Sequence, residues 1–296
     1  MTKPIKFNVS PLQRAMLLAC ITIICYITAS FLALIVLGKG MTATRMAIIT
    51  ILQDIFLFIV PSIVTAILIT RRPAEFLAID KGPSRRCLQL GILALLASIP
   101  AMNMIIEWNA SVTIPAWFGS FGQWIIDSEK SASEAIKVMV NGESVMSLIM
   151  LILVVGIFAG MSEELFFRGT IQRMMTTSGF SPHIAIWTTA IIFSAVHLQF
   201  FGFVPRLLLG AMFGYMAWWS GSVWLSVTAH CLNNSLAATV MWIASRNPES
   251  GVAEIETIGA GNLLTAGASA VISIGLLYAL KVFATKRPSI ARQSNQ

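Results

Sequence analysis

The sequence predicts an all-α protein, a polytopic transmembrane helical bundle of about eight spans with both termini cytoplasmic. Its 296 residues are 56% hydrophobic and only 11% charged, and the mean hydropathy is +0.80. A soluble domain carries about a quarter charged residues, so this composition predicts a protein of the lipid bilayer. It also argues against nucleic acid as a partner, because the basic face that such binding needs is missing.

Apolar runs define the expected helices, since a membrane-spanning helix needs about 20 such residues. Helices are expected rather than barrel strands because the runs are continuous and lipid offers the backbone no hydrogen-bond partners. The first run exceeds the roughly 7–15 residues of a signal-peptide core, so we expect it to remain as a span. The expected spans cover residues 15–38, 46–70, 87–106, 146–176, 183–200, 203–219, 222–245 and 260–283.

The distribution of lysine and arginine predicts the orientation of these spans. With the N-terminus inside, the cytoplasmic side holds 14 of the 20 basic residues, and the net charge of +7 follows from this bias. Arg206 lies near a span end on the other side and is expected to extend to the outer surface. The polar segment 286–296 is expected to be a disordered tail.

The long connection at residues 107–145 is expected to lie in the membrane interface. Aromatic side chains alternate there with small and polar ones, as in the belts that anchor proteins at the lipid headgroups. These side chains are Trp108, Trp117, Phe118, Phe121 and Trp124.

A few ionisable residues fall inside the expected spans. Each such group costs on the order of 2.5–3.5 kcal/mol at the bilayer centre, so a group of them predicts a functional site. Asp54, next to Gln53, can be read either as a satisfied packing contact or as part of that site. The others are Glu163, Glu164, His197 and His230.

Helix geometry predicts that these residues meet. The turn between the fourth and fifth spans is centred near Phe180, with Glu163 17 positions before it and His197 17 after it. Two antiparallel helices leaving one turn therefore place both side chains at the same depth. In the seventh span, His230 and Asn234 are four residues apart and share a helix face at a similar level.

The two glutamates are expected to differ. Glu164 and Arg168 have the i, i+4 spacing of a helical ion pair, whereas Glu163 points about 100° away around the axis. Arg168 is therefore expected to neutralise Glu164 and leave Glu163 free. Close helix packing near these residues is expected at two G-x-x-x-G pairs, which are Gly156 with Gly160 and Gly210 with Gly214.

Three motifs occur in order in separate spans: E-E-x-x-x-R at 163–168, F-x-x-x-H at 193–197 and H-x-x-x-N at 230–234. In these motifs the chain resembles the CAAX protease and bacteriocin-processing family, also called CPBP or Abi. The family comprises intramembrane endopeptidases related to CAAX prenyl protease and lysostaphin resistance protein A. The resemblance covers roughly residues 146–245.

This resemblance implies an enzyme that hydrolyses a peptide bond inside the membrane. Its substrate would be a membrane-associated protein or peptide, either lipidated or bearing a leader. Glu163 would activate the attacking water, and His197 would hold that water or a metal ion. His230 and Asn234 would stabilise the oxyanion. The ion pair of Glu164 with Arg168 would orient these groups.

A metal ion is an open question in this interpretation. Glu163, His197 and His230 would form a carboxylate-histidine set suited to a divalent metal such as Zn²⁺. However, Glu163 cannot serve both as a metal ligand and as a free base, and the sequence has no H-E-x-x-H run.

The resemblance also divides the chain. Residues 1–145 would supply N-terminal transmembrane helices with the interfacial segment at 107–145. Residues 146–245 would form the protease core, and residues 246–296 the last helix and a basic polar tail. We expect an integral protein of the bacterial inner membrane, with an active site that opens toward the cytoplasm.

Two other functions compete with proteolysis. A catalytically silent immunity or scaffold protein could keep the same fold and bind a partner in the membrane. A proton-coupled transporter could also use intramembrane acids and histidines, although its usual internal symmetry is not evident.

Overall fold

The computed structural model describes residues 10–285 except 39, 141, 143, 248–250, 252–254 and 256. The described residues form helices and no strand, which confirms the all-α fold. Lys3, Lys6 and the expected tail at 286–296 lie outside the described residues, so those predictions stay untested.

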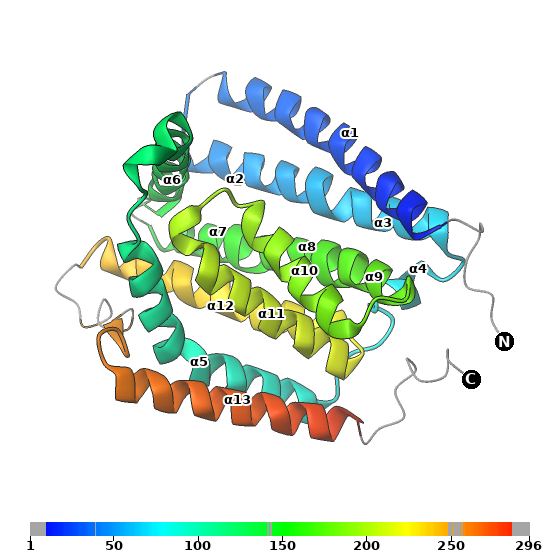
Figure 1. Ribbon diagram of the computed structural model, residues 1–296. Coiled ribbons are helices and arrows are strands. Elements are labelled where there is room, and N and C mark those ends of the chain that lie inside the picture. Colours follow the sequence, from blue (N-terminus) through cyan, green and yellow to red (C-terminus); the bar gives the residue numbers. More distant parts are fainter. Residues whose placement is uncertain are drawn as a thin grey trace.

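Figure 1 labels the α-helices in chain order, and η is used below for π-helical and 3₁₀ segments. The first half holds α1 (Pro11–Leu37), α2 (Ala43–Gln53), η1 (Asp54–Ile59), α3 (Val60–Ile69), α4 (Pro73–Phe76), α5 (Arg85–Ser111), η2 (Ala116–Phe118) and α6 (Gly119–Val140). The second half holds α7 (Val145–Leu151), η3 (Ile152–Ala159), α8 (Gly160–Glu164), η4 (Leu165–Gln172), α9 (Arg173–Thr177), α10 (Pro182–Ala195), η5 (Phe200–Gly202), α11 (Phe203–Ser220), α12 (Val223–Ala244) and α13 (Leu263–Thr285).

Six helical segments of the described residues are long and apolar enough to cross a membrane. They are Pro11–Leu37, Ala43–Ile69, Arg85–Ser111, Val145–Thr177, Phe200–Ser220 and Leu263–Ala284. A helix of 27 residues, such as the first, is about 40 Å long and exceeds the ~30 Å hydrocarbon core. The all-α bundle is as predicted. Of the eight expected spans, six meet the criteria of length and hydropathy within the described residues.

The remaining two expected spans are α10 and α12, which fall short for different reasons. α10 is apolar but has only 14 residues, because the chain turns after Ala195 rather than continuing to residue 200. α12 has 22 residues but is more polar, since His230, Asn233 and Asn234 lie in its middle. By contrast, the fourth expected span is one continuous helix from Val145 to Thr177, although charged residues interrupt its apolar run.

The bundle has three parts (Figure 1). α1 packs on α2 and α3 along one side, and α5 and α13 lie together along the opposite side. The chain from α7 to α12 lies between them, with α12 against η3 and α8, and α10 against α11. The start of α1 and the end of α13 lie at the same end of the bundle.

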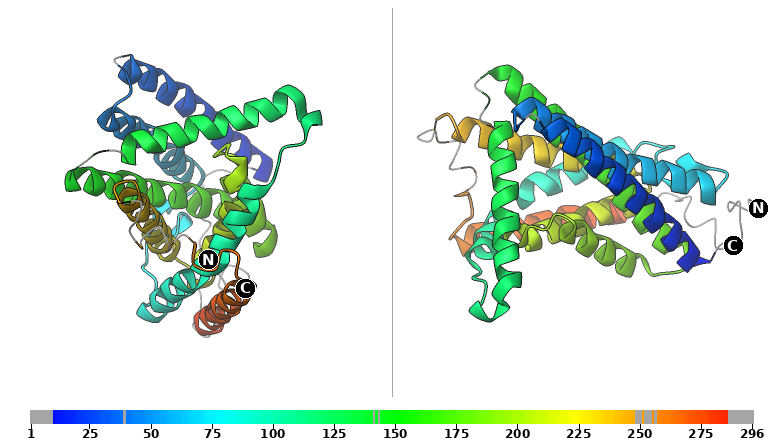
Figure 2. Two further views of the ribbon diagram at one scale, coloured as in Figure 1. Left: turned by 90° about the vertical axis from the view of Figure 1, so that its left-hand side faces the viewer. Right: turned by 90° about the horizontal axis from the view of Figure 1, so that it is seen from above.

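Helix α6 crosses the opposite end of the bundle at a steep angle to the long helices, as Figure 2 shows. Aromatic side chains of η2 and the start of α6 form a continuous stack, in which the rings of Phe118, Phe121 and Trp124 follow one another at centroid distances of 5.8 and 5.6 Å. The side chain of Trp117, at the base of this stack, is 80% exposed. An exposed aromatic row on a crosswise helix fits the interfacial position expected for this segment.

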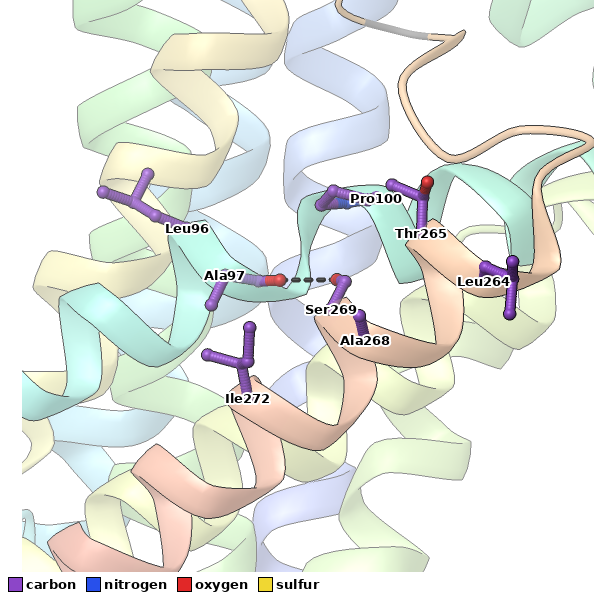
Figure 3. Close-up of a pocket in the computed structure, with 8 residues that line it drawn as sticks. All are labelled: Leu96, Ala97, Pro100, Leu264, Thr265, Ala268, Ser269 and Ile272. Atoms are coloured by element: carbon purple, nitrogen blue, oxygen red, sulfur yellow. Dashed lines mark hydrogen bonds between the residues drawn. The ribbon is translucent and has the colours of Figure 1, made fainter.

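Close contact between α5 and α13 depends on serine hydroxyls from α13. Pro100 interrupts the backbone hydrogen bonding of α5, and Ser269 is inserted beside it (Figure 3). The Ser269 hydroxyl donates to the carbonyl of Ala97 at 2.5 Å and accepts from the backbone N–H of Ala101 at 3.1 Å. One turn further along α13, Ser273 donates to the Ala94 carbonyl at 2.9 Å.

The glycines at 156 and 160 allow the helix that carries the two glutamates to approach α12. A Cβ atom at Gly156 would lie 2.4 Å from the Ser235 hydroxyl oxygen, and one at Gly160 would lie 3.1 Å from the Cys231 sulfur. Because these distances leave little or no space for a side chain, the predicted close packing at this G-x-x-x-G pair is confirmed.

Candidate active site

The two glutamates lie in the middle of the Val145–Thr177 helix, on a short α-helical stretch between two π-helical segments. These segments are η3 before the glutamates and η4 after them, and a third π segment, η1, begins at Asp54. A π-helical turn holds one more residue than an α-helical turn, so the side chains that follow are rotated to a different face. Such turns occur frequently at functional sites, and here they surround the ionisable residues.

Glu164 and Arg168 form the ion pair that their spacing predicts. Both side chains are fully buried, and Arg168 Nη1 lies 2.5 Å from Glu164 Oε1. The second terminal nitrogen, Nη2, donates to the carbonyl of Gly210 at 2.7 Å, and the guanidinium lies 4.8 Å above the ring of Phe193. A Cβ atom at Gly210 would lie 3.3 Å from Nη2, so this glycine allows α11 to approach the cation.

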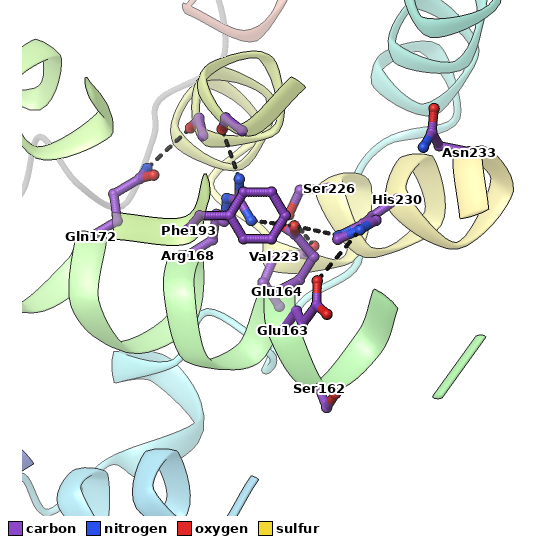
Figure 4. Close-up of polar contacts among 12 residues, drawn as sticks. Ser162, Glu163, Glu164, Arg168, Gln172, Phe193, Val223, Ser226, His230 and Asn233 are labelled. Atoms are coloured by element: carbon purple, nitrogen blue, oxygen red, sulfur yellow. Dashed lines mark hydrogen bonds and ion pairs between the residues drawn. The ribbon is translucent and has the colours of Figure 1, made fainter. Parts of the chain in front are cut away.

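The same contact is repeated one turn further along both helices. Gln172 Nε2 donates to the Gly214 carbonyl at 3.0 Å, and a Cβ atom at Gly214 would lie 2.8 Å from Gln172 Oε1. The second G-x-x-x-G pair therefore also packs closely, as predicted, and it fixes α11 against the helix of the glutamates (Figure 4).

His230 on α12 faces both glutamates from one side (Figure 4). Its Nδ1 is 2.9 Å from Glu164 Oε1, and its Nε2 is 3.6 Å from Glu163 Oε2. Since the Glu164 carboxylate is held by Arg168 and can only accept, Nδ1–H donates to it. The distance from Nε2 to Glu163 is too long for a hydrogen bond, so Nε2 and Glu163 are adjacent without being tied together. Phe213 stacks on the imidazole at a centroid distance of 4.9 Å.

Glu163 is the more accessible of the two carboxylates. Its side chain is 13% exposed, whereas that of Glu164 is completely buried. Arg168 contacts Glu164, and no arginine or lysine of the described residues forms an ion pair with Glu163. The predicted difference between the two acids is therefore present, with Glu163 left available.

His197 follows the end of α10, within electrostatic range of Glu163. Its Nδ1 is 2.7 Å from the carbonyl oxygen of Phe193, so Nδ1–H donates there and Nε2 is left as the acceptor in the neutral ring. The ring of Phe193 contacts both histidines edge to face, at centroid distances of 5.0 Å from His197 and 5.7 Å from His230. This phenylalanine therefore links the two imidazoles at one edge of the site.

Asn234 lies one helical turn beyond His230, as the sequence predicts. It contacts the helix that carries the glutamates, but at a point before the two carboxylates. Its Nδ2 donates to the Val155 carbonyl at 3.3 Å, and its Oδ1 accepts from Asn233 at 3.3 Å. The structure therefore brings Glu163, Glu164 and His230 into one cluster, with His197 nearby and Asn234 at its margin. The role of Asn234 stays a prediction.

The expected metal ligands do not converge as a metal site. Among the described residues, no group of three or more His, Cys, Asp or Glu side chains is arranged so that it could hold a metal ion. His230 directs Nδ1 to Glu164, so that only its Nε2 faces Glu163, and His197 directs Nδ1 to the Phe193 carbonyl. Since the residues do not fit the group as they lie, we derive no step through a metal.

Two further residues lie near this cluster. Asp54 at the start of η1 is 4% exposed, lies beside Ser162 and is within electrostatic range of Glu163. Its Oδ2 has no hydrogen-bond partner in the described part of the chain. Of the two interpretations of Asp54, a place near the site is thus the one that the geometry favours.

Arg206 is partly buried beside the turn that follows His197. It donates to Gln199, and the acids whose charges act on it are Glu129 on α6 and Glu163 in the site. Its expected extension to the outer surface stays a prediction.

Comparison with known proteins shows a family similarity in the part of the chain that carries this cluster. Residues 145–236 match the family described as type II CAAX prenyl endopeptidase, Rce1-like. The matched segment contains all three motifs and the whole cluster around His230, which confirms the resemblance predicted from the motifs. The family is one of proteases, and the apolar helices show the membrane character of this chain.

Among individual proteins, the chain is similar to YpbD of Bacillus subtilis (strain 168), which is described as uncharacterized. The two are 28% identical over 81 residues, which is 26% of this chain and 38% of the length of that relative. No solved structure matches the chain.

Proposed function

We propose that this protein is an intramembrane endopeptidase that uses Glu163 to activate water against a peptide bond of a membrane-associated protein or peptide. The observation that carries this proposal is the asymmetry of the two glutamates around His230. Glu164 is fully buried and paired with Arg168, while Glu163 is partly accessible and bound to no arginine or lysine of the described residues. A free carboxylate beside two imidazoles in an otherwise apolar bundle is suited to general-base catalysis.

In the proposed reaction, Glu163 carries one proton from the attacking water to the leaving nitrogen. Glu163 accepts a proton from water as the water oxygen attacks the carbonyl carbon of the peptide bond, which forms a tetrahedral intermediate with a negative oxygen. Glu163 then returns the proton to the nitrogen of the leaving peptide as the carbon–nitrogen bond breaks. The products are a new carboxyl terminus and a new amino terminus.

The histidines have distinct roles in this reaction. His197 has Nε2 free as an acceptor, since Nδ1–H is fixed on the Phe193 carbonyl, and so it can orient the attacking water. His230 in its imidazolium form has a second N–H, on Nε2, which can donate to the negative oxygen, while Nδ1–H stays on Glu164. Asn234 is the second donor in this proposal, and it would exchange its contact with Val155 for the oxyanion.

The location and the substrate follow from the same proposal. The start of α1 and the end of α13 lie at one end of the bundle, which supports both termini in the cytoplasm of a bacterial inner membrane. The site then opens toward the cytoplasm, where lipidated or leader-bearing proteins are available to it. The family description, which names prenylated CAAX substrates, supports a lipidated protein as one substrate class.

The test compares new peptide termini in cells that make the wild type, Glu163→Gln or Glu134→Gln at equal abundance. Glu134 is an exposed acid on α6, so its variant controls for loss of one negative charge. We expect termini that depend on the wild type to persist with Glu134→Gln and to disappear with Glu163→Gln. The helicity and unfolding midpoint of the purified proteins show whether each variant is folded.

Persistence of the same termini in folded Glu163→Gln would refute the proposed base. If the wild type and Glu163→Gln give identical termini and identical cellular phenotypes, the scaffold function is favoured. A wild-type-dependent proton flux in vesicles without new termini would favour the transporter.

A further inference from the structure

The end of the bundle that holds the start of α1 and the end of α13 is strongly basic, and α5 begins there as well (Figure 1). The acids among the described residues at this end each lie beside a cation. Glu75 is 3.0 Å from Arg72, and Asp80 is 3.8 Å from Lys81. The exposed basic side chains outnumber these acids; they are Arg71, Arg72, Lys81, Arg85, Arg86 and Lys281.

Two of these cations are adjacent at the start of α5. Arg85 and Arg86 follow the N-cap residue Ser84, and the first turn of the helix contains no acid. The guanidinium of Arg86 lies 5.2 Å from the ring centroid of Phe283, which places it over the seam between α5 and α13. Among the described residues, no carboxylate forms a salt bridge with either arginine. The sequence therefore concentrates positive charge at this seam rather than balancing it.

A third cation, Lys81, lies four residues before Arg85 on a loop that is fixed to the start of α12. The Ser222 hydroxyl donates to the Lys81 carbonyl at 2.6 Å, and the ring N–H of Trp224 donates to the Ile79 carbonyl at 3.0 Å. The backbone of Lys81 is thus held in place, while its ammonium group extends into the surroundings. Lys81, Arg85 and Arg86 are called the basic patch below.

The basic patch lies where the apolar surface of the seam ends. Tyr278 and Ile274 on α13 and Leu93 on α5 are exposed. Tyr278 is separated from Phe283 by about 8 Å along the helix axis. Exposed apolar side chains on membrane-spanning helices face lipid tails, and tyrosine is enriched where the tails meet the headgroups. The basic patch therefore lies at the depth of the lipid phosphates.

We propose that the basic patch binds the phosphate of an anionic phospholipid, whose acyl chains lie on the exposed apolar side chains of α5 and α13. A guanidinium offers parallel N–H groups that match two phosphate oxygens, so adjacent arginines suit this ligand. The apolar surface next to the cations favours a lipid over a soluble anion, because a lipid fills both parts. Since Arg86 lies over a ring of α13, the bound lipid stabilises the α5–α13 seam.

The experiment uses the full-length protein in micelles of a neutral detergent. The unfolding midpoint is recorded as phosphatidylglycerol or phosphatidylcholine is added at equal mole fraction. A ligand of the native state raises the midpoint in a saturable manner, and we expect this with phosphatidylglycerol and not with phosphatidylcholine. Each basic residue near an anionic lipid contributes about 5-fold in affinity. Replacing both arginines, in Arg85→Gln with Arg86→Gln, should therefore raise the half-saturating lipid fraction roughly 25-fold.

Two control variants separate the basic patch from general charge attraction. Lys130→Gln with Lys137→Gln removes two exposed cations from α6, at the other end of the bundle, and should leave the half-saturating fraction unchanged. Arg85→Lys with Arg86→Lys keeps the charge and should keep most of the affinity. Equal weakening by the α6 variant would overturn the assignment to the basic patch. Should the double glutamine variant fail to fold, Arg85→Gln alone should weaken binding about 5-fold, and an unchanged fraction would overturn the inference.

Other probes identify the source of the anion. If glycerol 3-phosphate raises the midpoint as much as phosphatidylglycerol at the same concentration, the ligand is a soluble phosphate and the lipid assignment is wrong. A rise with a glutamate-rich peptide but not with phosphatidylglycerol would replace the lipid by a protein partner. No rise of the wild-type midpoint with phosphatidylglycerol would also overturn the inference. Because unfolding is measured without substrate, none of these outcomes bears on the proposed peptidase function.

Discussion

Replacing Arg168 with methionine should destabilise the protein far more than loss of an ordinary surface charge. The guanidinium is fully buried, and it contacts Glu164 at 2.5 Å and the Gly210 carbonyl at 2.7 Å. In Arg168→Met the Glu164 carboxylate would remain fully buried without its cation. It would keep the contact to His230 Nδ1 at 2.9 Å and the Ser226 hydroxyl nearby, both weaker partners than a guanidinium.

The expected magnitude follows from the burial of both partners. Removing one member of a buried ion pair costs about 3–5 kcal/mol, because an uncompensated charge is left behind. The double variant Glu164→Gln with Arg168→Met has no buried charge and keeps an acceptor for His230. Its cost should therefore be about 1–2 kcal/mol, as expected for lost hydrogen bonds. The double variant should thus be more stable than Arg168→Met alone.

The measurement is the free energy of unfolding in detergent micelles, followed by helicity for the wild type, both single variants and the double variant. Arg72→Met is the matched control, since Arg72 forms a pair with Glu75 at 3.0 Å in which both side chains are 54% exposed. That change should cost less than about 1 kcal/mol. Equal costs for Arg72→Met and Arg168→Met, or a double variant less stable than either single variant, would refute this account of the pair.

Three other changes test the packing and the membrane position. Gly156→Ala should lower the free energy of unfolding by about 1–3 kcal/mol, because its Cβ would lie 2.4 Å from Ser235 Oγ. Gly275→Ala on α13 is the control, since its Cβ meets nothing within 4 Å and the change should be neutral or stabilising. Equal effects of the two changes on the free energy of unfolding would contradict the close packing. Ser269→Ala should cost about 1–3 kcal/mol by leaving backbone groups of α5 unpaired, and Thr28→Ala, which removes a similar hydroxyl contact within α1, should cost less than about 0.5 kcal/mol. In a variant whose only tryptophan is Trp117, lipids brominated near the headgroup should quench the tryptophan fluorescence more than lipids brominated at the chain end. Strong quenching by aqueous iodide instead would contradict an interfacial position of this segment.

Local patterns explain why parts of this molecule could be predicted from its sequence. Long apolar runs predicted the helix from Val145 to Thr177 to within a residue at each end, even across its charged centre. Helix periodicity predicted the pairing of Glu164 with Arg168, and the symmetric spacing about Phe180 predicted that Glu163 and His197 lie near each other. These features depend on residues close in sequence or on helices joined by one short turn.

Other features depend on contacts between distant segments and left no local pattern. The π-helical segment before the glutamates, Ile152–Ala159, has an ordinary apolar sequence. The position of Arg206 depends on Gln199, on Gly202 and on the hydrogen bond by which Asn109 holds the turn between them. Similarly, the early end of α10 reflects the left-handed Leu198 rather than a loss of hydrophobicity.

The hydroxyl of Ser269 has a consequence for the biogenesis of the protein. As the chain enters the membrane, α5 arrives long before α13, and its backbone at Ala97 and Ala101 then has no hydroxyl to bridge it. Unpaired backbone groups in lipid cost several kcal/mol, so an insertion intermediate that lacks α13 has a weakened α5 beside the future site. The final helix thus completes α5, and a ribosome must translate nearly the whole described chain before the first half of the bundle reaches its mature stability.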